Sequence, residues 1–228
     1  MKSMAWKILI VDDEPDIVDF IEYNLQKEDF ITAKAYNGED ALKIAADFRP
    51  DLIILDVMMP QMDGIDTCRR LRQNPDLTST YIMFLTARSE EYSEIAGFEA
   101  GADDFVYKPV KPRALMSRIN AIARRKSLTV DPDSSSVSHK GIKIDPSSYT
   151  VSIQDKELAF PKKEFELLYL LMSKPGKVFT REKILNKIWG ESVYVVDRTI
   201  DVHIRKIREK IGDDMIQTVK GVGYKFVA

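Results

Sequence analysis

Short apolar stretches alternate with amphipathic stretches along the first half of the chain. The apolar stretches are rich in β-branched residues and lie at residues 7–11, 31–36, 51–55, 81–85 and 104–107. Between them, apolar residues recur with helical spacing, and in the first such segment they are Ile17, Val18, Phe20, Ile21 and Leu25. Four more helices are predicted at 38–48, 64–73, 90–99 and 112–125. Apolar strands that alternate with helices are typical of a parallel sheet covered on both faces, so the pattern predicts a doubly wound α/β fold of five strands.

The pattern changes after residue 126. Residues 127–136 are rich in Ser, Asp and Pro, which predicts a linker at 127–137 between one domain at 1–126 and another at 138–228. The second domain shows short β patterns at 142–144, 150–153 and 157–160, helices that begin near Pro161, Thr180 and Asp197, and a final hairpin around residues 221–223. Three helices followed by a hairpin favour an α+β winged helix-turn-helix.

Composition narrows the class of protein. The chain has 228 residues, and its one cysteine, Cys68, cannot form an internal disulfide or a metal site made only of cysteines. Its two histidines, His139 and His203, are too far apart in sequence to indicate a zinc site. No apolar run reaches the roughly 20 residues of a membrane span, and residues 1–7 lack the apolar core of a signal peptide. We therefore expect a cytoplasmic protein without membrane insertion.

Charge is distributed unevenly between the two predicted domains. Residues 1–126 carry 17 basic and 22 acidic side chains, a net charge of −5, whereas residues 127–228 carry 17 basic and 14 acidic side chains, a net charge of +3. An acidic half joined to a basic half suggests different partners, with cations for the first and a polyanion for the second.

Chemistry-bearing residues follow the predicted strands of the first domain. Asp12 and Asp13 follow the first strand, Asp56 follows the third, Thr86 ends the fourth and Lys108 follows the fifth. Parallel strands place such residues together in the crevice at their carboxyl ends. Several carboxylates there attract a hard cation such as Mg²⁺, while a lysine and a hydroxyl can bind an anion. One aspartate at this edge is therefore predicted to attack phosphorus and form an aspartyl phosphate.

The motifs at residues 11–14, 55–64, 85–87 and 101–109 resemble the receiver domain of two-component response regulators, over residues 7–125. The resemblance implies a flavodoxin-like sheet of order 2-1-3-4-5, Asp56 as phosphoacceptor and a sensor histidine kinase as phosphodonor. It implies that Mg²⁺ is bound by Asp13, Asp56 and the backbone carbonyl of Met58, and by Asp12 through water. Lys108 and Thr86 would then bind the phosphoryl oxygens, and Thr86 and Phe105 would act as switch residues.

The last predicted helix has one apolar and one basic face. Ile200, Ile204, Ile207 and Ile211 recur at spacings of 4, 3 and 4, so they are expected to face the core. The basic residues point elsewhere, and a basic exposed helix fits the major groove of DNA.

Residues 198–208 and 218–226 resemble the recognition helix and wing of the OmpR/PhoB subfamily, a match that spans about 140–228. By that resemblance Val202, Arg205 and Lys206 face bases. The phosphate contacts would come from Arg198, Thr199, His203 and Arg208, and Lys220 at the hairpin turn would reach the backbone or the minor groove.

The sequence departs from the family pattern at several positions. The switch aromatic is Phe105 where Tyr is frequent, and the wing carries Lys220 where Arg is frequent. Members of the subfamily typically dimerise through interlocked ion pairs, of which Asp104 and Arg118 remain as one candidate pair. The remaining pairs are incomplete because Glu94, Ala114 and Asn120 replace a base, an acid and a base, respectively.

The sequence is therefore interpreted as a transcription regulator that dimerises and binds promoter DNA when Asp56 is phosphorylated, with RNA polymerase as a further candidate partner. It is not expected to be an enzyme beyond its own phosphorylation and slow dephosphorylation. One alternative is a regulator whose receiver acts independently of phosphorylation. Another is a Mg²⁺ phosphohydrolase of the haloacid-dehalogenase type, which is disfavoured because Met58 stands where that class has its second acid.

Overall fold

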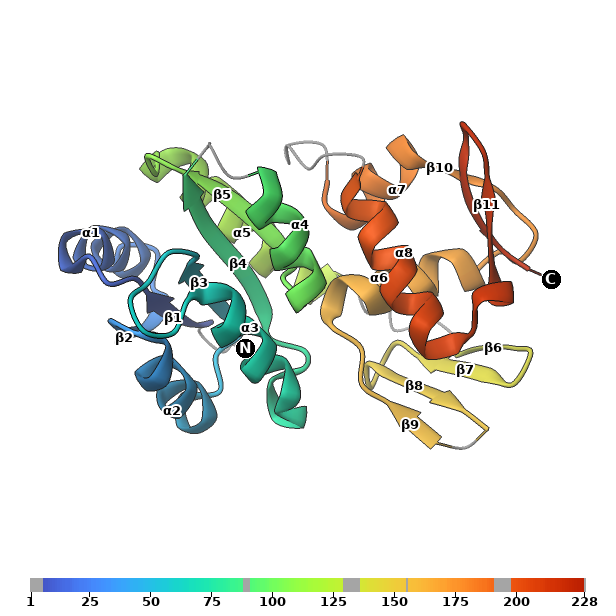
Figure 1. The fold of residues 1–228 in the computed structure, drawn as a ribbon, viewed down its shortest axis with the longest axis horizontal. Coiled ribbons are helices and arrows are strands. Elements are labelled where there is room, and N and C mark those ends of the chain that lie inside the picture. The colour runs from blue at the N-terminus through green and yellow to red at the C-terminus, as the bar shows by residue number, and fades with distance from the viewer. Residues whose placement is uncertain (1–5, 88–90, 129–135, 155, 191–197, 228) are drawn as a thin grey trace. The chain divides into compact units, whose positions relative to one another are not determined.

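The computed structural model describes residues 6–87, 91–128, 136–154, 156–190 and 198–227. The chain divides into two compact units, Met1–Arg125 and Lys126–Ala228 (Figure 1). Each unit has its own sheet and its own apolar core.

The first unit is built around a parallel sheet in the order β2-β1-β3-β4-β5. Its strands are β1 (Lys7–Val11), β2 (Ile31–Ala35), β3 (Leu52–Asp56), β4 (Tyr81–Ala87) and β5 (Asp104–Lys108). Its helices are α1 (Pro15–Gln26), α2 (Gly38–Phe48), α3 (Gly64–Gln73), the 3-10 turn η1 (Pro75–Leu77), α4 (Glu91–Ala100) and α5 (Pro112–Leu128). The doubly wound fold and the strand order are confirmed. Helices α2 and α3 begin where the sequence predicts because the side chains of Asn37 and Asp63 cap their first turns.

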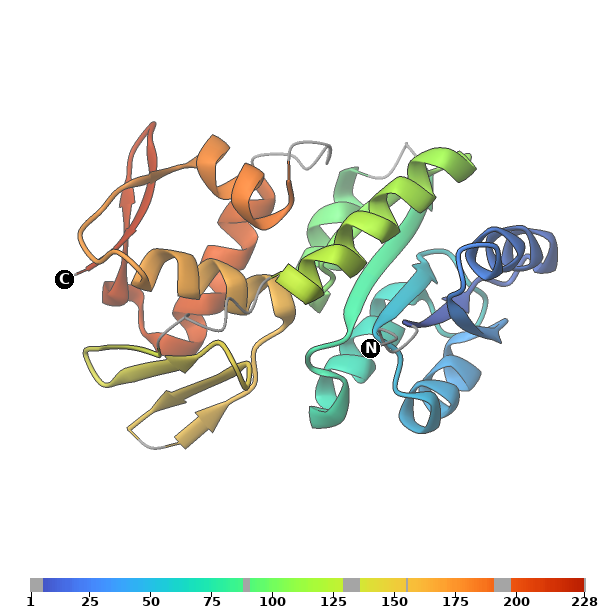
Figure 2. The same cartoon turned by 180° about the vertical axis from the view of Figure 1, so that it is seen from behind.

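Helices cover both faces of this sheet. Alternate strand residues, among them Ile8, Ile10, Leu52 and Ile54, form one apolar cluster with α1 and α5. Figure 1 shows α3 and α4 in front of the sheet, and Figure 2 shows α5 on the opposite side. Because the sheet is covered on both faces, its inner strands β1, β3 and β4 are largely apolar rather than alternating, whereas the edge strand β2 carries Thr32 and Lys34.

Strand register brings the candidate residues of the first unit to one edge. Val11 on β1 pairs with Leu55 on β3, so the residues that follow them, Asp12 and Asp56, lie side by side. Asp56 pairs with Leu85 on β4, and Thr86 pairs with Tyr107 on β5. The carboxyl ends of β1, β3, β4 and β5 thus form a single rim.

The second unit combines two antiparallel sheets with three helices. One sheet has the order β6-β7-β8-β9 and the other β10-β12-β11. Their strands are β6 (Val137–His139), β7 (Ile142–Asp145), β8 (Thr150–Ile153), β9 (Lys156–Leu158), β10 (Phe179–Thr180), β11 (Ile216–Val219) and β12 (Gly223–Phe226). The helices are α6 (Lys162–Met172), α7 (Arg181–Ile188), α8 (Arg198–Ile211) and the 3-10 turn η2 (Asp213–Met215). The winged-helix arrangement is confirmed, and β6 and β10 are additions that the sequence pattern did not indicate.

The linker differs from its predicted bounds of 127–137. Helix α5 continues to Leu128, and β6 begins at Val137. Ser127 and Leu128 continue α5 although the composition assigns them to the linker, and Val137 pairs with Ile144 of β7 in a short hairpin that composition does not reveal. Residues 129–135 lie outside the described part of the chain.

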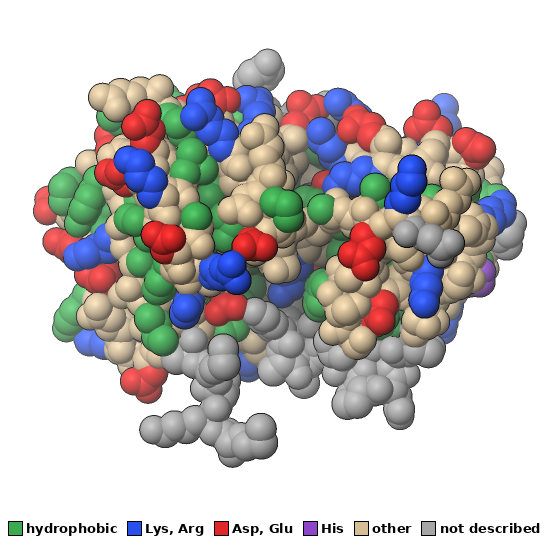
Figure 3. Space-filling model, turned by 90° about the horizontal axis from the view of Figure 1, so that it is seen from below, with side chains coloured by type: hydrophobic (Ala, Val, Ile, Leu, Met, Phe, Trp, Pro, Cys, Tyr) green, Lys and Arg blue, Asp and Glu red, His purple; other side chains and the backbone are tan. Residues whose placement is uncertain are grey.

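Surface charge and helix length give two further observations. Acidic and basic side chains are interspersed on the face shown in Figure 3, so the charge difference between the two halves is not visible there.

Of the helices in the described part of the chain, none combines the length and apolar character that crossing a bilayer requires.

Candidate functional site

Two of the three predicted aspartates lie together at the rim of the parallel sheet. Asp12 is 0% exposed and Asp56 is 3% exposed, although both are acidic. The backbone amide of Glu14 donates to Oδ1 of Asp12 at 3.0 Å, and that of Met58 donates to Oδ2 of Asp56 at 2.7 Å. Asp13 is exposed. Backbone amides therefore hold two buried carboxylates in fixed positions at the strand ends.

Lys108, the last residue of β5, contacts both buried carboxylates, as its place at this strand end predicts. Its Nζ lies 2.7 Å from Oδ1 of Asp56 and 3.0 Å from Oδ2 of Asp12. A third, more exposed carboxylate, that of Glu14, lies 3.3 Å from the same nitrogen. The peptide bond between Lys108 and Pro109 is cis. The ammonium group thus offsets the repulsion between two carboxylates that burial has brought together.

The pKa values at this rim are perturbed. Burial raises the pKa of Asp56, and together with the negative charge of Asp12 it outweighs the lowering effect of Lys108, so the pKa reaches about 6. Burial lowers the pKa of Lys108, but hydrogen bonds to Asp56 and Asp12 outweigh it and hold that pKa above its ordinary value. A buried carboxylate with a raised pKa beside a specific charged partner marks a candidate functional site.

The oxygen donors at this rim suit a hard divalent cation such as Mg²⁺. Oδ2 of Asp12 is buried, and Lys108 Nζ lies 3.0 Å from it. A cation bound to this oxygen would therefore share it with the ammonium group of Lys108. Within the described ranges, no three Asp, Glu, His or Cys side chains are already close enough to hold a metal, and Asp13 is exposed. The donor set fits Mg²⁺ in its chemistry, with Asp12 and Asp56 buried at the rim and Asp13 exposed next to them in the chain.

The backbone at Gly64 packs closely against the backbone of Asp56 and Val57. The amide of Gly64, the first residue of α3, donates to the carbonyl oxygen of Val57 at 2.9 Å. A Cβ atom at Gly64 would lie 2.0 Å from the carbonyl oxygen of Asp56, so only glycine fits there. The side chain of Met58 is 64% exposed, so Met58 contributes to the rim through its backbone, whose amide donates to Asp56.

The two predicted switch residues are both buried. Thr86 lies at the end of β4, and the ring of Phe105 packs against Phe84 and Phe98 with centroid distances of 5.3 and 4.7 Å. A Cβ atom at Gly97 of α4 would lie 2.5 Å from Cζ of Phe105. The missing side chain at Gly97 therefore makes room for the inward position of the aromatic ring.

The residues predicted for a dimer interface are paired within one chain. Arg118 of α5 contacts both carboxylate oxygens of Asp104, at 2.8 and 2.9 Å, and donates to the carbonyl oxygen of Phe105 at 2.9 Å. Ala114 is exposed, and Asn120 donates to Glu28 at 3.4 Å. The side chain of Glu94 lies outside the described part of the chain. In this structure, the Asp104–Arg118 pair thus joins β5 to α5.

Helix α8 presents part of the predicted DNA-contacting set. Its four isoleucines are buried as predicted. Arg205 is exposed, and Val202 and Lys206 are half-buried. Nε of Arg205 donates to Glu209 at 3.0 Å, and Lys206 lies 3.6 Å from the same carboxylate. Lys220 is exposed in the turn between β11 and β12.

Three of the predicted phosphate contacts are not placed on the exposed face. Thr199 is 2% exposed and His203 is 1% exposed, with the imidazole ring 5.3 Å from the ring of Trp189. Arg208 donates to the carbonyl oxygen of Ile216 and to Oγ1 of Thr218. Thr199 and His203 are buried because the buried stripe of α8 is wider than its isoleucines, and their contacts with phosphates stay a prediction. The side chain of Arg198 lies outside the described residues.

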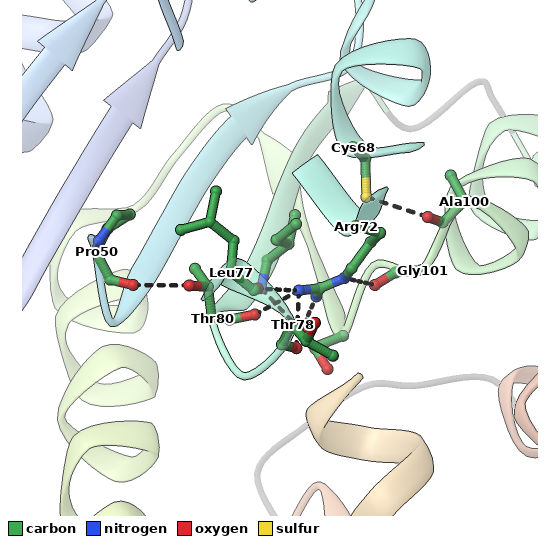
Figure 4. A network of polar contacts seen from close by, with 10 residues as sticks. Pro50, Cys68, Arg72, Leu77, Thr78, Thr80, Ala100 and Gly101 are labelled. Carbon is green, nitrogen blue, oxygen red and sulfur yellow. Dashed lines mark hydrogen bonds and ion pairs between the residues drawn. The ribbon is translucent and has the colours of Figure 1, made fainter. Parts of the chain in front are cut away.

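A polar network around Arg72 was missed by sequence reasoning. Its guanidinium donates to the carbonyl oxygens of Leu77, Thr78, Thr80 and Gly101 and to the carboxylate of Asp103 (Figure 4). The carboxylate of Asp103 is 0% exposed and also accepts from the amide of Ile82 at 2.8 Å. No local pattern indicates this role, because an arginine in the last turn of an amphipathic helix is ordinarily solvated.

Cys68 is buried next to Ala100, the last residue of α4. Its Sγ atom donates to the carbonyl oxygen of Ala100 at 3.5 Å (Figure 4). Burial raises the pKa of the thiol to about 12. At pH 8 the native thiol is therefore almost entirely protonated. We expect Cys68 to react with iodoacetamide about 100-fold more slowly in the native chain than in urea, as measured by mass spectrometry. Equal rates would show that the thiol is accessible.

Comparisons with known proteins cover both units. A family model described as the response regulator receiver domain matches residues 8–120, and one described as transcriptional regulatory protein, C terminal, matches residues 155–226. A solved structure of DrrB, a Thermotoga maritima OmpR/PhoB homolog, is 36% identical, with 99% of this chain and 100% of that chain covered and a TM-score of 0.51.

Two further solved structures match at full length. A mutant of RitR is 29% identical, with 97% of this chain and 99% of that chain covered and a TM-score of 0.80. A streptococcal protein, from a family of redox sensors that evolved from two-component response regulators, is 30% identical, with 97% and 99% covered and a TM-score of 0.51.

Proposed function

Because the chain belongs to the family of two-component response regulators that join a receiver domain to an OmpR/PhoB-type transcriptional regulatory domain, we propose that phosphorylation of Asp56 controls its binding to DNA. The observation that carries this proposal is the contact of 2.7 Å between Lys108 and a buried Asp56 beside Asp12. Asp56 combines burial, a fixed orientation and an adjacent cation, which are the properties of a nucleophilic carboxylate.

The proposed reaction transfers a phosphoryl group to the carboxylate. One oxygen of Asp56 forms the new bond to phosphorus, while the bond from phosphorus to the donor's leaving atom breaks and its electron pair leaves with the donor. Lys108 exchanges part of its contact with Asp56 for a phosphoryl oxygen, and the Thr86 hydroxyl donates to another. Mg²⁺, when bound, offsets the repulsion between the aspartate and the phosphoryl oxygens. Asp13, Asp56 and the carbonyl of Met58 would hold it, with Asp12 acting through water.

The proposed partners follow from the two domains. A sensor histidine kinase supplies the phosphoryl group, and the C-terminal unit binds double-stranded promoter DNA as a homodimer, with RNA polymerase as a further partner. Dimerisation raises DNA affinity because the second unit binds at high effective concentration. No other enzymatic activity is proposed, and a cytoplasmic location is part of the proposal. A redox role like that of the streptococcal relative is not included, because Cys68 is buried and its thiol protonated.

Phosphorylation must reach the DNA-binding unit through a two-state surface. We propose the contact between Phe105 and α4 as one part of this surface, because the aromatic ring occupies the space that Gly97 leaves. In the structure Asp104 and Arg118 pair within one chain, next to Phe105. In the proposed dimer, this internal ion pair either breaks so that both residues form ion pairs with the second chain, or it persists while other residues form the interface.

The test of the proposed function is a comparison of DNA affinity before and after incubation with acetyl phosphate and Mg²⁺. The DNA is a duplex that the full chain selects from a random-sequence pool. A rise in affinity on phosphorylation supports the proposal, and equal affinities favour a regulator whose receiver acts independently of phosphorylation.

Arg205→Ala is expected to relax base preference, with about a tenfold loss of affinity for the selected duplex and little change for a scrambled duplex. Lys220→Ala should weaken both duplexes alike and reduce the salt dependence, because a phosphate contact reads no sequence. Fluorescence anisotropy titrations at two salt concentrations measure both effects. Lys143→Ala, at an exposed position on β7, is the charge-matched control. An equal loss on both duplexes for Arg205→Ala would place Arg205 on the phosphates instead.

A further inference from the structure

Three side chains from three elements of the C-terminal unit meet at one point. Arg181 is the first residue of α7, Asp201 lies in the first turn of α8 and Tyr224 lies on β12. The Tyr224 hydroxyl donates to Oδ1 of Asp201 at 2.5 Å. The guanidinium of Arg181 donates to the same Oδ1 at 2.9 Å and to the Tyr224 hydroxyl at 3.1 Å. The three groups form a closed triangle of polar contacts, which we call the Arg181–Asp201–Tyr224 triad.

Tyr224 is the rigid member of this triad. It lies on the central strand of its sheet, where it pairs with Phe179 on one side and Thr218 on the other. It is 4% exposed, and the guanidinium carbon of Arg181 lies 5.1 Å from its ring centroid. Burial raises the pKa of Tyr224 to about 12, with a further contribution from Asp201, so at neutral pH the hydroxyl keeps the proton that it donates. The sheet therefore presents a fixed donor to the start of α8.

A second connection ties α8 to the same hairpin. Arg208 donates to the carbonyl oxygen of Ile216 and to Oγ1 of Thr218, both on β11. Asp201 and Arg208 are two helical turns apart, which is about 10 Å along the helix axis. Two attachments at that separation fix the direction of the helix relative to the hairpin. The proposed base-contacting residues Val202, Arg205 and Lys206 lie between them.

This arrangement matters because the proposed DNA contacts are divided between two elements. Arg205 projects from α8, whereas Lys220 lies in the hairpin turn. Arg205 and Lys220 can contact the same duplex only when the angle between α8 and the hairpin is correct. If the free protein already holds that angle, no free energy is spent on fixing it when DNA binds.

We propose that the Arg181–Asp201–Tyr224 triad is a positioning device that holds α8 at the angle to the β11–β12 hairpin required for sequence-specific DNA binding. The inference rests on the proposed DNA-binding function, and it assigns these residues a role that needs no contact with DNA. A direct phosphate contact by Arg181 is the main competing role, because its side chain is 25% exposed.

The test is Tyr224→Phe in the full chain, with the selected duplex and a scrambled duplex of the same composition as probes. The substitution keeps the ring in the core and removes only the hydroxyl, and the carboxylate of Asp201 remains solvated because it is 48% exposed. We expect about a tenfold loss of affinity for the selected duplex, less than about a twofold change for the scrambled duplex and an unchanged salt dependence. Tyr169→Phe on α6 is the matched control and should change neither affinity. Thermal unfolding confirms that both variants are folded.

A double-mutant cycle with Arg181→Met separates positioning from direct contact. If the triad acts as one device, the double variant Arg181→Met/Tyr224→Phe loses little more affinity for the selected duplex than the weaker-binding single variant does. Losses that multiply, equal losses on both duplexes or an unchanged Tyr224→Phe variant each overturn the inference. If the unsubstituted chain selects no sequence from the pool, the proposed DNA binding fails and this inference fails with it. If it selects a sequence and Tyr224→Phe binds that sequence equally well, only the positioning role is rejected.

Discussion

Asp56→Asn will take up no phosphoryl group from acetyl phosphate and Mg²⁺, whereas the unsubstituted chain will gain the mass of one. The amide keeps the size of the side chain and can still accept from the amide of Met58, but it lacks the carboxylate that attacks phosphorus. Intact-mass spectrometry at neutral pH measures the uptake. The same variant should lose the phosphodonor-dependent gain in DNA affinity entirely.

The control for this prediction is Asp63→Asn in the same loop. Asp63 is exposed, and Oδ1 of its side chain accepts from the amide of Asp66 as the N-cap of α3, which asparagine also does. Its phosphoryl uptake should equal that of the unsubstituted chain. Full uptake by Asp56→Asn would mean that another residue is the phosphoacceptor and that the site at the rim is misassigned.

Arg72→Met will destabilise the first unit by about 3–5 kcal/mol, the usual cost of removing one partner from a buried ion pair. The substitution removes the guanidinium that neutralises the carboxylate of Asp103, with side-chain exposures of 9% and 0%, respectively. It also leaves the carbonyl oxygens of Leu77, Thr80 and Gly101 without the donor that now joins them. Because these oxygens belong to the η1–β4 connection and to the end of α4, both segments should loosen together.

Urea unfolding followed by peptide-resolved hydrogen exchange measures this loss in each unit separately. Arg69→Met is the matched control on the same helix, because Arg69 forms an ion pair with Asp66 whose partners are about half exposed. Its cost should be below about 0.5 kcal/mol. Equal costs for the two variants, or a loss confined to the C-terminal unit, would show that the Arg72 network contributes little to stability.

The receiver unit was predictable from the sequence to an unusual depth because its signals are local. The segments of β1, β3 and β4 are largely continuous apolar runs, and apolar residues recur with helical spacing between the strands. The helix starts predicted at residues 38 and 64 are those of α2 and α3, whose first turns Asn37 and Asp63 cap in the structure. Placing Asp12, Asp56 and Lys108 at one rim required only the rule that parallel strands end at one edge. The sequence alone could not show that Asp13 is exposed, because side-chain direction in a loop has no periodicity.

The C-terminal unit contains features that local sequence patterns do not indicate. The spacing of Ile200, Ile204, Ile207 and Ile211 identified the buried line of α8, and all four are buried. The spacing did not give the width of the buried stripe, which also includes Thr199 and His203, the latter packed against Trp189. Strand β10 went unnoticed because two residues carry no pattern of their own, and it forms only by pairing with β12.

The sequence by itself determined the two domains, the order of their elements and the residue types at the phosphoacceptor rim, because these depend on periodicity, capping and strand ends. Only the tertiary structure decided which polar groups meet: Arg72 with Asp103, Arg181 with Asp201 and Tyr224, and Arg118 with Asp104 of the same chain, a pair that the sequence assigned to a dimer. The residues in these contacts are between 14 and 43 positions apart. Such contacts depend on the packing of whole elements, which no short stretch of sequence specifies.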